Sequence, residues 1–295
     1  MSKETIAGID IGSNAIRLLI NYVEGENGSQ TYKKALFIRI PLRLGEDVFT
    51  CKKISNEKIA KLGKAMRAFA DLMETFDITK YRACATSAMR EAVNNKEIVR
   101  IIKQISGISI EIISGTEEAK YVFAATSLES NPVIDKSKSC LYVDVGGGST
   151  ELIIYNEQQN MVSESFPIGT VRMLSGSVQG EEWQYFKYRL KKIADKYNPA
   201  YIIGSGGNIN KTFKILEKKE QDFITCTEIK SLYDKIVAIS YEDRIKYMKL
   251  NESRADVIVP ALKIFLTICK QCNIEQIIVP NVGLADGIIR KLAQE

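Results

Sequence analysis

The most informative absence in this chain of 295 residues is histidine, of which it has none. Without an imidazole there is no histidine general base, no Ser-His-Asp or Cys-His nucleophile system, no phosphohistidine and no histidine-ligated metal. Any proton transfer must therefore use Asp, Glu, Lys, Tyr or Cys. A bound metal is expected to be a hard cation held by oxygen ligands.

Long apolar runs and basic blocks are also missing. No run reaches the roughly 18 residues that a membrane span needs, and Glu4 and Asp10 interrupt the segment where a signal peptide would be apolar. The net charge of +5 is mild and not concentrated as in nucleic-acid binders. The length permits about two domains. We therefore expect a globular protein that binds neither nucleic acid nor a membrane.

The six cysteines do not make a disulfide framework in a chain of this length. Cys269 and Cys272 form one C-x-x-C, but a structural zinc site needs a second pair or histidines. Both cysteines lie in a segment with helical apolar spacing, so buried thiols are favoured. Reduced thiols predict a cytoplasmic protein.

The first half of the chain has an α/β order. Strands are predicted at 5–10, 15–23 and 32–43, joined by short turns as an antiparallel meander. Ser55 can cap the helix that follows. The strand "YRACAT" then leads into "SAMREA" and a helix that Gly107 ends, and the strand "ISIEII" runs into a helix that opens at "SGTEEA".

The second half repeats this order. "SCLYVDV", "ELIIYNE" and "MVSESFPIG" read as three strands, followed by helical sequence over 170–196. "AYIIGSGGNINKTFKIL" is strand, turn and helix; two or three helices fill 227–272, and "IEQIIVPNVGLADGIIRKL" closes the chain. A polar, proline-containing linker over 127–139 predicts two duplicated domains, 1–126 and 127–295.

Each half opens with the same pattern, "IDIGSNAIRLLI" at 9–20 and "VDVGGGSTELII" at 143–154. Glycines in such turns permit positive φ and let several N–H groups point at one phosphate. A tight hairpin turn is the plainer alternative for either loop alone, but the pairing favours phosphate binding. "GSGGNI" has Ile at the last glycine of a dinucleotide fingerprint, and no P-loop occurs, so neither a Rossmann dehydrogenase nor a P-loop enzyme is expected.

Six ordered motifs, "DIGSN", "ATSAMREA", "SGTEEA", "DVGGGSTEL", "FPIGTVR" and "GSGGNINK", resemble the exopolyphosphatase / guanosine pentaphosphate phosphohydrolase (Ppx/GppA) family over essentially the whole chain. The resemblance implies an α/β fold with two duplicated actin-like domains (ribonuclease H-like, ASKHA superfamily) around a central cleft. It also implies hydrolysis of terminal phosphates with Mg²⁺ or another divalent cation.

Carried over to this sequence, the resemblance makes Glu118 the catalytic residue that activates water. The neighbouring acid has another role, because Ser114 and Glu117 fit a capping box, S-x-x-E. Glu118 points about a hundred degrees away around the helix and is free to face the substrate. The alternative is a solvated first-turn acid that the helix dipole favours.

The other site residues follow from the same resemblance. Arg90 would hold phosphate with its planar fork; a surface ion pair with Glu91 or Glu97 is the alternative. Acids beside a polyphosphate would repel it without a cation, which predicts a metal site, although Asp10 and Asp144 could equally cap turn N–H groups. The phosphate-binding set is Gly12, Ser13, Asn14, Arg90, Gly146, Gly147, Gly148 and Ser149, and the metal set is Asp144, Glu151 and Asp10.

The expected activity is an exopolyphosphatase that releases orthophosphate from inorganic polyphosphate. Longer family members carry a histidine-containing HD-like helical domain that this chain lacks, so a short form with low processivity and a preference for short chains is expected. Hydrolysis of pppGpp to ppGpp is the rival activity, and a non-catalytic phosphate- or alarmone-binding regulator is the rival without turnover. A sugar or acid kinase is disfavoured. The resemblance is also compatible with a homodimer.

Overall fold

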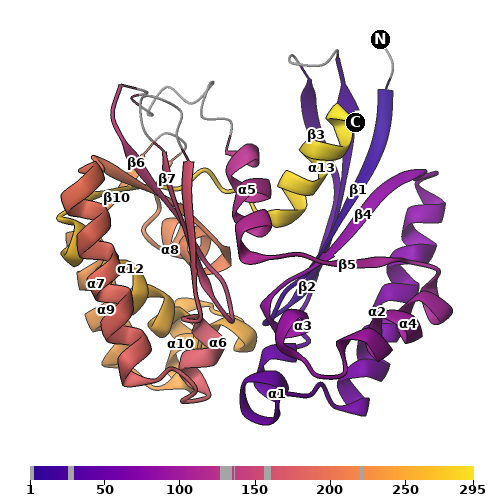
Figure 1. The fold of residues 1–295 in the computed structure, drawn as a ribbon, viewed down its shortest axis with the longest axis horizontal. Coiled ribbons are helices and arrows are strands. Elements are labelled where there is room, and N and C mark those ends of the chain that lie inside the picture. Colours follow the sequence, from indigo (N-terminus) through magenta and orange to yellow (C-terminus); the bar gives the residue numbers. More distant parts are fainter. Residues whose placement is uncertain (1–2, 26–29, 127–134, 136, 156–160, 220–221) are drawn as a thin grey trace. The chain divides into compact units, whose positions relative to one another are not determined.

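The computed structural model describes residues 3–25, 30–126, 135, 137–155, 161–219 and 222–295 (Figure 1). The chain divides into two compact units. The first comprises Met1–Ala125 together with Gly283–Glu295, and the second comprises Thr126–Val282. The predicted linker over 127–139 lies mostly outside the described residues. Among the helices that are described, none is long and apolar enough to cross a membrane.

The first unit is built on a five-stranded sheet in the order β3-β2-β1-β4-β5. β1, β2 and β3 pair antiparallel, as the sequence predicted, and β4 and β5 run parallel to β1. The alternation of buried and exposed side chains is weak in β2, whose residues are buried on both faces. The strands are β1 (Lys3–Ile11), β2 (Ile16–Glu24), β3 (Thr31–Ile40), β4 (Lys80–Ala85) and β5 (Ile110–Ile112).

The helices of this unit follow most of the predicted start and stop signals. The hydroxyl of Ser55 accepts a hydrogen bond from the N–H of Lys58 at the start of α2, and Gly107 ends α4 with a φ of 74°. α1 was not predicted, because Arg43 precedes it in a left-handed conformation without a capping side chain. These helices are α1 (Leu44–Cys51), α2 (Asn56–Thr75), α3 (Ser87–Glu91), α4 (Asn95–Ser106) and α5 (Gly115–Ala125).

The second unit repeats the plan of the first. Its sheet has the order β10-β11-β9-β6-β7-β8, in which β8-β7-β6-β9-β11 matches β3-β2-β1-β4-β5 strand for strand. β6, β7 and β8 again form an antiparallel meander, while β9 is parallel to β6 and β11 to β9. The strands are β6 (Cys140–Val145), β7 (Thr150–Tyr155), β8 (Met161–Phe166), β9 (Tyr201–Ser205), β10 (Phe223–Thr225) and β11 (Gln276–Ile278). The duplication read from the sequence is therefore present in the topology.

Helices cover this second sheet around a core that includes Leu141, Phe186 and Phe265. The single helical stretch expected over 170–196 is in fact two helices, separated near Gly176, whose φ is 68°. Four helices rather than two or three occupy the region from 226 to 272. The helices are α6 (Thr170–Leu174), α7 (Gly180–Tyr197), α8 (Gly207–Ile215), α9 (Cys226–Val237), α10 (Tyr241–Met248), α11 (Glu252–Ala255) and α12 (Ile258–Cys272).

The last helix, α13 (Leu284–Gln294), belongs to the first unit and not to the predicted domain 127–295. Its apolar side, with Leu284, Ile288 and Ile289 buried, packs against β1 and α5 (Figure 1). Burial of these side chains stabilises the packing of α13 on the first unit, because each contributes about 1.5–3 kcal/mol to the free energy of unfolding when removed from water. The predicted domain is corrected accordingly at residues 283–295.

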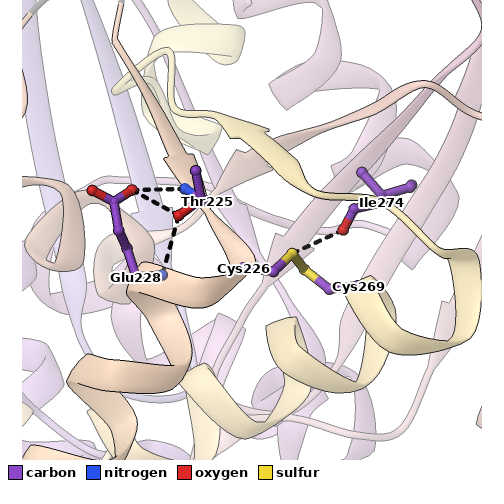
Figure 2. Close-up of a disulfide and its surroundings, with 5 residues drawn as sticks. All are labelled: Thr225, Cys226, Glu228, Cys269 and Ile274. Atoms are coloured by element: carbon purple, nitrogen blue, oxygen red, sulfur yellow. Dashed lines mark hydrogen bonds between the residues drawn. A yellow bond between two sulfur atoms is a disulfide. The ribbon is translucent and has the colours of Figure 1, made fainter.

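One pair of cysteines departs from the prediction of reduced thiols. Cys226 and Cys269 form a disulfide with their Cα atoms 6.5 Å apart (Figure 2). Cys226 is the first residue of α9, whose start is fixed by reciprocal hydrogen bonds between Thr225 and Glu228, and α9 packs on α12, which carries Cys269. This packing brings together two residues that are far apart in the sequence. Cys272 is a buried free thiol, as predicted.

Candidate active site

The loop between β1 and β2 is a tight hairpin turn. The N–H of Gly12 donates to the carbonyl of Ala15 across a distance of 3.1 Å. The backbone carbonyls of Ser13 and Asn14 accept hydrogen bonds from Gly45 and Arg43, which anchors the loop to the start of α1. The Ser13 hydroxyl is buried and lies 2.7 Å from that of Ser87, at the start of α3. Gly12, Ser13 and Asn14 of the predicted phosphate-binding set are thus held in one rigid turn.

Arginines surround this first loop. Arg17 lies opposite Asp10 in the register of β1 and β2, and the two form an ion pair. Arg39 lies opposite Arg17 on β3, and Arg43 follows a few residues later. Burial, with the charges of Arg17 and Arg43 nearby, lowers the pKa of Arg39 to about 10. The first loop therefore lies beside three arginines, two of which are paired with acids, Arg17 with Asp10 and Arg43 with Glu46.

The arginine cluster of Arg17, Arg39 and Arg43 was not among the predicted site residues. A signal was present in "FIRIPLRLG", where two arginines interrupt an otherwise apolar segment. Asp10, in contrast, was predicted as a metal ligand. Its carboxylate pairs with Arg17, and its role toward a metal stays a prediction.

The loop between β6 and β7 has the same backbone turn, since the N–H of Gly146 donates to the carbonyl of Ser149 at 3.0 Å. The second loop is covered by the start of α6. The carbonyl of Gly147 accepts from the N–H groups of Val171 and Arg172, and the buried Arg172 side chain donates to the carbonyl of Gly148 at 2.7 Å. The predicted residues Gly146, Gly147, Gly148 and Ser149 are therefore held as firmly as those of the first loop.

The reason for the glycines differs from the prediction. Among the described glycines, positive φ occurs at Gly206 but not at Gly12 or Gly146–Gly148. A steric requirement is found instead at Gly169, in the "FPIGT" segment that packs on this loop. A Cβ at Gly169 would lie 2.4 Å from the carbonyl carbon of Gly148 and 2.5 Å from that of Gly147. Residue 169 must therefore be a glycine for this segment to lie against the second loop.

Acids line the second loop where the first has an ion pair. Asp144 lies opposite Glu151 in the antiparallel register of β6 and β7, so that both side chains project from the same face. Glu151 is buried, and one of its oxygens accepts hydrogen bonds from the hydroxyls of Ser149 at 2.6 Å and Ser165 at 3.2 Å. Gly206, with φ 106°, brings the turn after β9 against Asp144, whose Oδ1 lies 3.0 Å from the position of a Cβ there.

Two carboxylates at adjacent cross-strand positions suit a hard cation. Mg²⁺ is commonly bound by one or two carboxylates together with water and substrate phosphate, and Asp144 and Glu151 fit this donor set. Across the described residues, no group of three or more His, Cys, Asp and Glu side chains gathers as a metal site. The fit therefore rests on this pair, and the metal remains a prediction.

Glu118 lies in the first turn of α5 and is 9% exposed. Its carboxylate pairs with the guanidinium of Arg90 at 3.3 Å, and the same Arg90 nitrogen donates to the carbonyl of Ile113 at 2.7 Å. The structure thus brings together the predicted catalytic acid and the predicted phosphate-binding arginine. The surface ion pairs of Arg90 with Glu91 or Glu97 are not what the geometry shows; Glu91 is near Lys52 instead.

The neighbouring acid behaves as the sequence predicted. Glu117 accepts hydrogen bonds from the N–H and hydroxyl of Ser114, both at 2.8 Å, and its own N–H donates to the Ser114 hydroxyl. These hydrogen bonds from Ser114 hold the pKa of Glu117 below its usual value. Of the two adjacent acids, one is committed to capping α5 and the other is turned toward Arg90.

The fold and these loops define a duplicated α/β protein with an equivalent hairpin turn in each half. Residues 37–295 match the model of the Ppx/GppA phosphatase family, and the chain belongs to this family. A putative exopolyphosphatase of Haemophilus influenzae is 27% identical over 97% of this chain and 91% of its own length. A guanosine-5'-triphosphate,3'-diphosphate pyrophosphatase of Aeromonas salmonicida is 25% identical over 96% of this chain, which spans 58% of that relative.

Solved structures confirm the predicted α/β fold. The Ppx/GppA enzyme of Aquifex aeolicus superposes with a TM-score of 0.76 at 25% identity, covering 98% of this chain and all of that one. An exopolyphosphatase of Cytophaga hutchinsonii gives a TM-score of 0.84 over 98% of both chains; at 22% identity this supports the fold alone. The relatives named above are phosphoanhydride hydrolases, and the predicted enzyme class is confirmed at that level.

Proposed function

We propose that this protein is an exopolyphosphatase that hydrolyses the terminal phosphoanhydride bond of inorganic polyphosphate, with Glu118 as general base. The observation that carries the proposal is the buried pair of Glu118 and Arg90, together with the diversion of Glu117 into the helix cap. Such a pair places a base beside a group that can hold the reacting phosphate. Placement in the cytoplasm and a homodimer remain predictions.

In the proposed reaction, Arg90 and the arginines around the first loop bind the terminal phosphate. An incoming phosphate oxygen competes for Arg90, which frees the Glu118 carboxylate to accept a proton from water. The water oxygen forms a new bond to phosphorus while the bridging P–O bond breaks, and the bridging oxygen keeps the electron pair on the shortened chain. Phosphoryl transfer depends mainly on such positioning and charge stabilisation.

The backbone N–H groups and hydroxyls of the two loops, including Ser13, Asn14 and Ser149, are proposed to bind further phosphate oxygens. Asp144 and Glu151 would hold Mg²⁺ or another divalent cation, which when bound offsets the negative charge of the phosphates. Asp10 is left out of this set because Arg17 occupies its carboxylate. Its proposed role is to orient Arg17 toward the first loop.

Hydrolysis of pppGpp is the second candidate, favoured by the Aeromonas relative, whose match extends over nearly all of this chain. The proposed chemistry is the same, because a terminal phosphate is removed from an anhydride in both substrates. Phosphate release should therefore be measured side by side with tripolyphosphate, long polyphosphate, pppGpp and ATP. A preference for short polyphosphate is the expected result, and turnover of pppGpp alone would replace the first candidate with the second.

The residue-level test compares Glu118→Gln with Glu117→Gln, two neighbouring substitutions of the same kind. A general base contributes about 10²–10⁴-fold to rate, so Glu118→Gln should lose kcat by at least about that factor while still binding polyphosphate. Glu117→Gln should keep near wild-type turnover and lose only stability at the start of α5. Equal turnover of wild type and Glu118→Gln would refute the proposal, and no turnover by any of the proteins would favour a binding regulator.

A further inference from the structure

In the first unit, α13 and α5 lie in close backbone contact next to the proposed base. A Cβ at Gly287 would lie 2.0 Å from the carbonyl oxygen of Tyr121, 2.4 Å from its carbonyl carbon and 3.1 Å from its Cα. All three atoms are backbone, so no side-chain rotation could relieve the contact. Only glycine permits α5 to lie where it does against α13. Tyr121 is one helical turn after Glu118 on the same face of α5.

The opposite side of α13 is also close to the strand that leads into the first loop. A Cβ at Gly8 would lie 2.6 Å from the carbonyl oxygen of Ala285 and 3.3 Å from Cγ1 of Ile289. Gly8 is two residues before Asp10 on β1. The helix thus touches β1 on one side and α5 on the other, in both cases at a glycine (Figure 1).

We propose that Gly287 is a positioning residue for the reaction, because its contact with Tyr121 sets where Glu118 stands relative to Arg90 and the first loop. This inference rests on the proposed function, in which Glu118 is the base. It assigns to the C-terminal helix the role of a spacer: the thickness of α13 at its two glycine contacts fixes the separation between β1 and α5.

Arg90 has an anchor outside α5 in addition to its ion pair with Glu118. It lies on α3 and donates to the carbonyl of Ile113, whose own N–H donates to the carbonyl of Ala85 on β4. A displacement of α5 away from α13 would therefore carry Glu118 with it and leave Arg90 in place. Misplacement of a catalytic group by about 1 Å can cost on the order of 10²-fold in rate. A methyl group at this contact should therefore lower kcat.

The test is Gly287→Ala, with Gly180→Ala as the matched control. Gly180 also lies in a helix, α7, but a Cβ there meets nothing within 4 Å. We expect kcat of Gly287→Ala on polyphosphate to fall by about 10–100-fold, with a much smaller change in KM, and Gly180→Ala to keep wild-type kinetics. Each variant is also made in the Glu118→Gln background, where the loss caused by Gly287→Ala should disappear because the group it displaces is already gone.

Three results separate the possibilities. Full activity of Glu118→Gln would overturn the proposed function. An impaired Glu118→Gln enzyme together with wild-type kcat in Gly287→Ala would overturn the positioning role alone. Equal losses from Gly287→Ala with and without Glu118 would also overturn it, since a general loss of structure acts in both backgrounds.

If Gly287→Ala does not fold, Ile289→Val provides the second variant. Ile289 is fully buried on α13 and faces the Gly8 contact. Removing one methyl group there leaves a small cavity that folded proteins tolerate and allows α13 to shift. The expected loss of kcat is a few-fold, and it should again be absent in the Glu118→Gln background; unchanged kcat in Ile289→Val would contradict the spacer role.

Discussion

The two hairpin loops occupy equivalent places in equivalent sheets, yet they have opposite electrostatic character. In the first, Asp10 lies opposite Arg17; in the second, Asp144 lies opposite Glu151. The backbone turns are the same, with one N–H to carbonyl bond across each loop. A single exchange of charge at one cross-strand position thus separates a loop with a paired aspartate from a loop with two adjacent carboxylates. The two halves share the backbone turn and differ in the residue opposite the aspartate.

The largest expected difference between the loops concerns packing. Gly169→Ala places a Cβ 2.4 Å from backbone of the second loop, whereas Gly12→Ala in the first loop meets its nearest atom, the carbonyl oxygen of Ala15, at 3.1 Å. Overpacking of this kind costs about 1–3 kcal/mol, so the free energy of unfolding of Gly169→Ala should fall by that amount and that of Gly12→Ala by less. Urea denaturation measures both. Equal losses would show that the two loops are equally confined.

The second difference concerns the metal. Glu151→Gln should raise the Mg²⁺ concentration needed for half-maximal activity by at least about tenfold, since even groups that only support a ligand contribute that much to metal affinity. Asp10→Asn should leave this concentration near the wild-type value, because Arg17 already neutralises Asp10. Phosphate release across a Mg²⁺ titration provides the measurement. A similar shift in both variants would remove the proposed distinction between the loops.

The smallest expected effect is on substrate binding by Arg39, beside the first loop. Arg39→Gln should raise KM for polyphosphate by up to about fivefold without changing kcat, a contribution of about 0.2–1 kcal/mol for a partly exposed charge. The difference should shrink as salt is added. Arg67→Gln is the control, because Arg67 is an exposed residue on α2 paired with Asp71. A kcat effect in Arg39→Gln, or an equal KM effect in Arg67→Gln, would contradict the assignment.

The features that could be predicted from the sequence are those that depend on residues close together in the chain. The two Asp–Gly hairpins, the cap at Ser55, the stop at Gly107 and the reciprocal bonds of Ser114 with Glu117 each depend on residues within a few positions of one another. The spacing of the residues is enough to predict such interactions. The family resemblance supplied Glu118 and Arg90, which the structure places together.

Features that depend on packing between distant segments could not be predicted from the sequence. The disulfide joins residues 43 positions apart, and it forms because α9 lies on α12. Arg39 reaches the first loop through the register of β3 with β2. The glycines of the second loop were attributed to positive φ, which the structure does not show, whereas the tight backbone contact at Gly169 comes from another segment. In each case the contacting residue is distant in the sequence, so no local sequence pattern predicts the contact.

The return of α13 to the first sheet has a consequence for biosynthesis. The ribosome must produce all of Thr126–Val282 before the residues that complete the first unit exist. At about 5–20 residues per second, the nascent N-terminal portion waits on the order of ten seconds with the α13-facing sides of β1 and α5 bare. The first unit can therefore complete its fold only after the whole of the second unit has been synthesised.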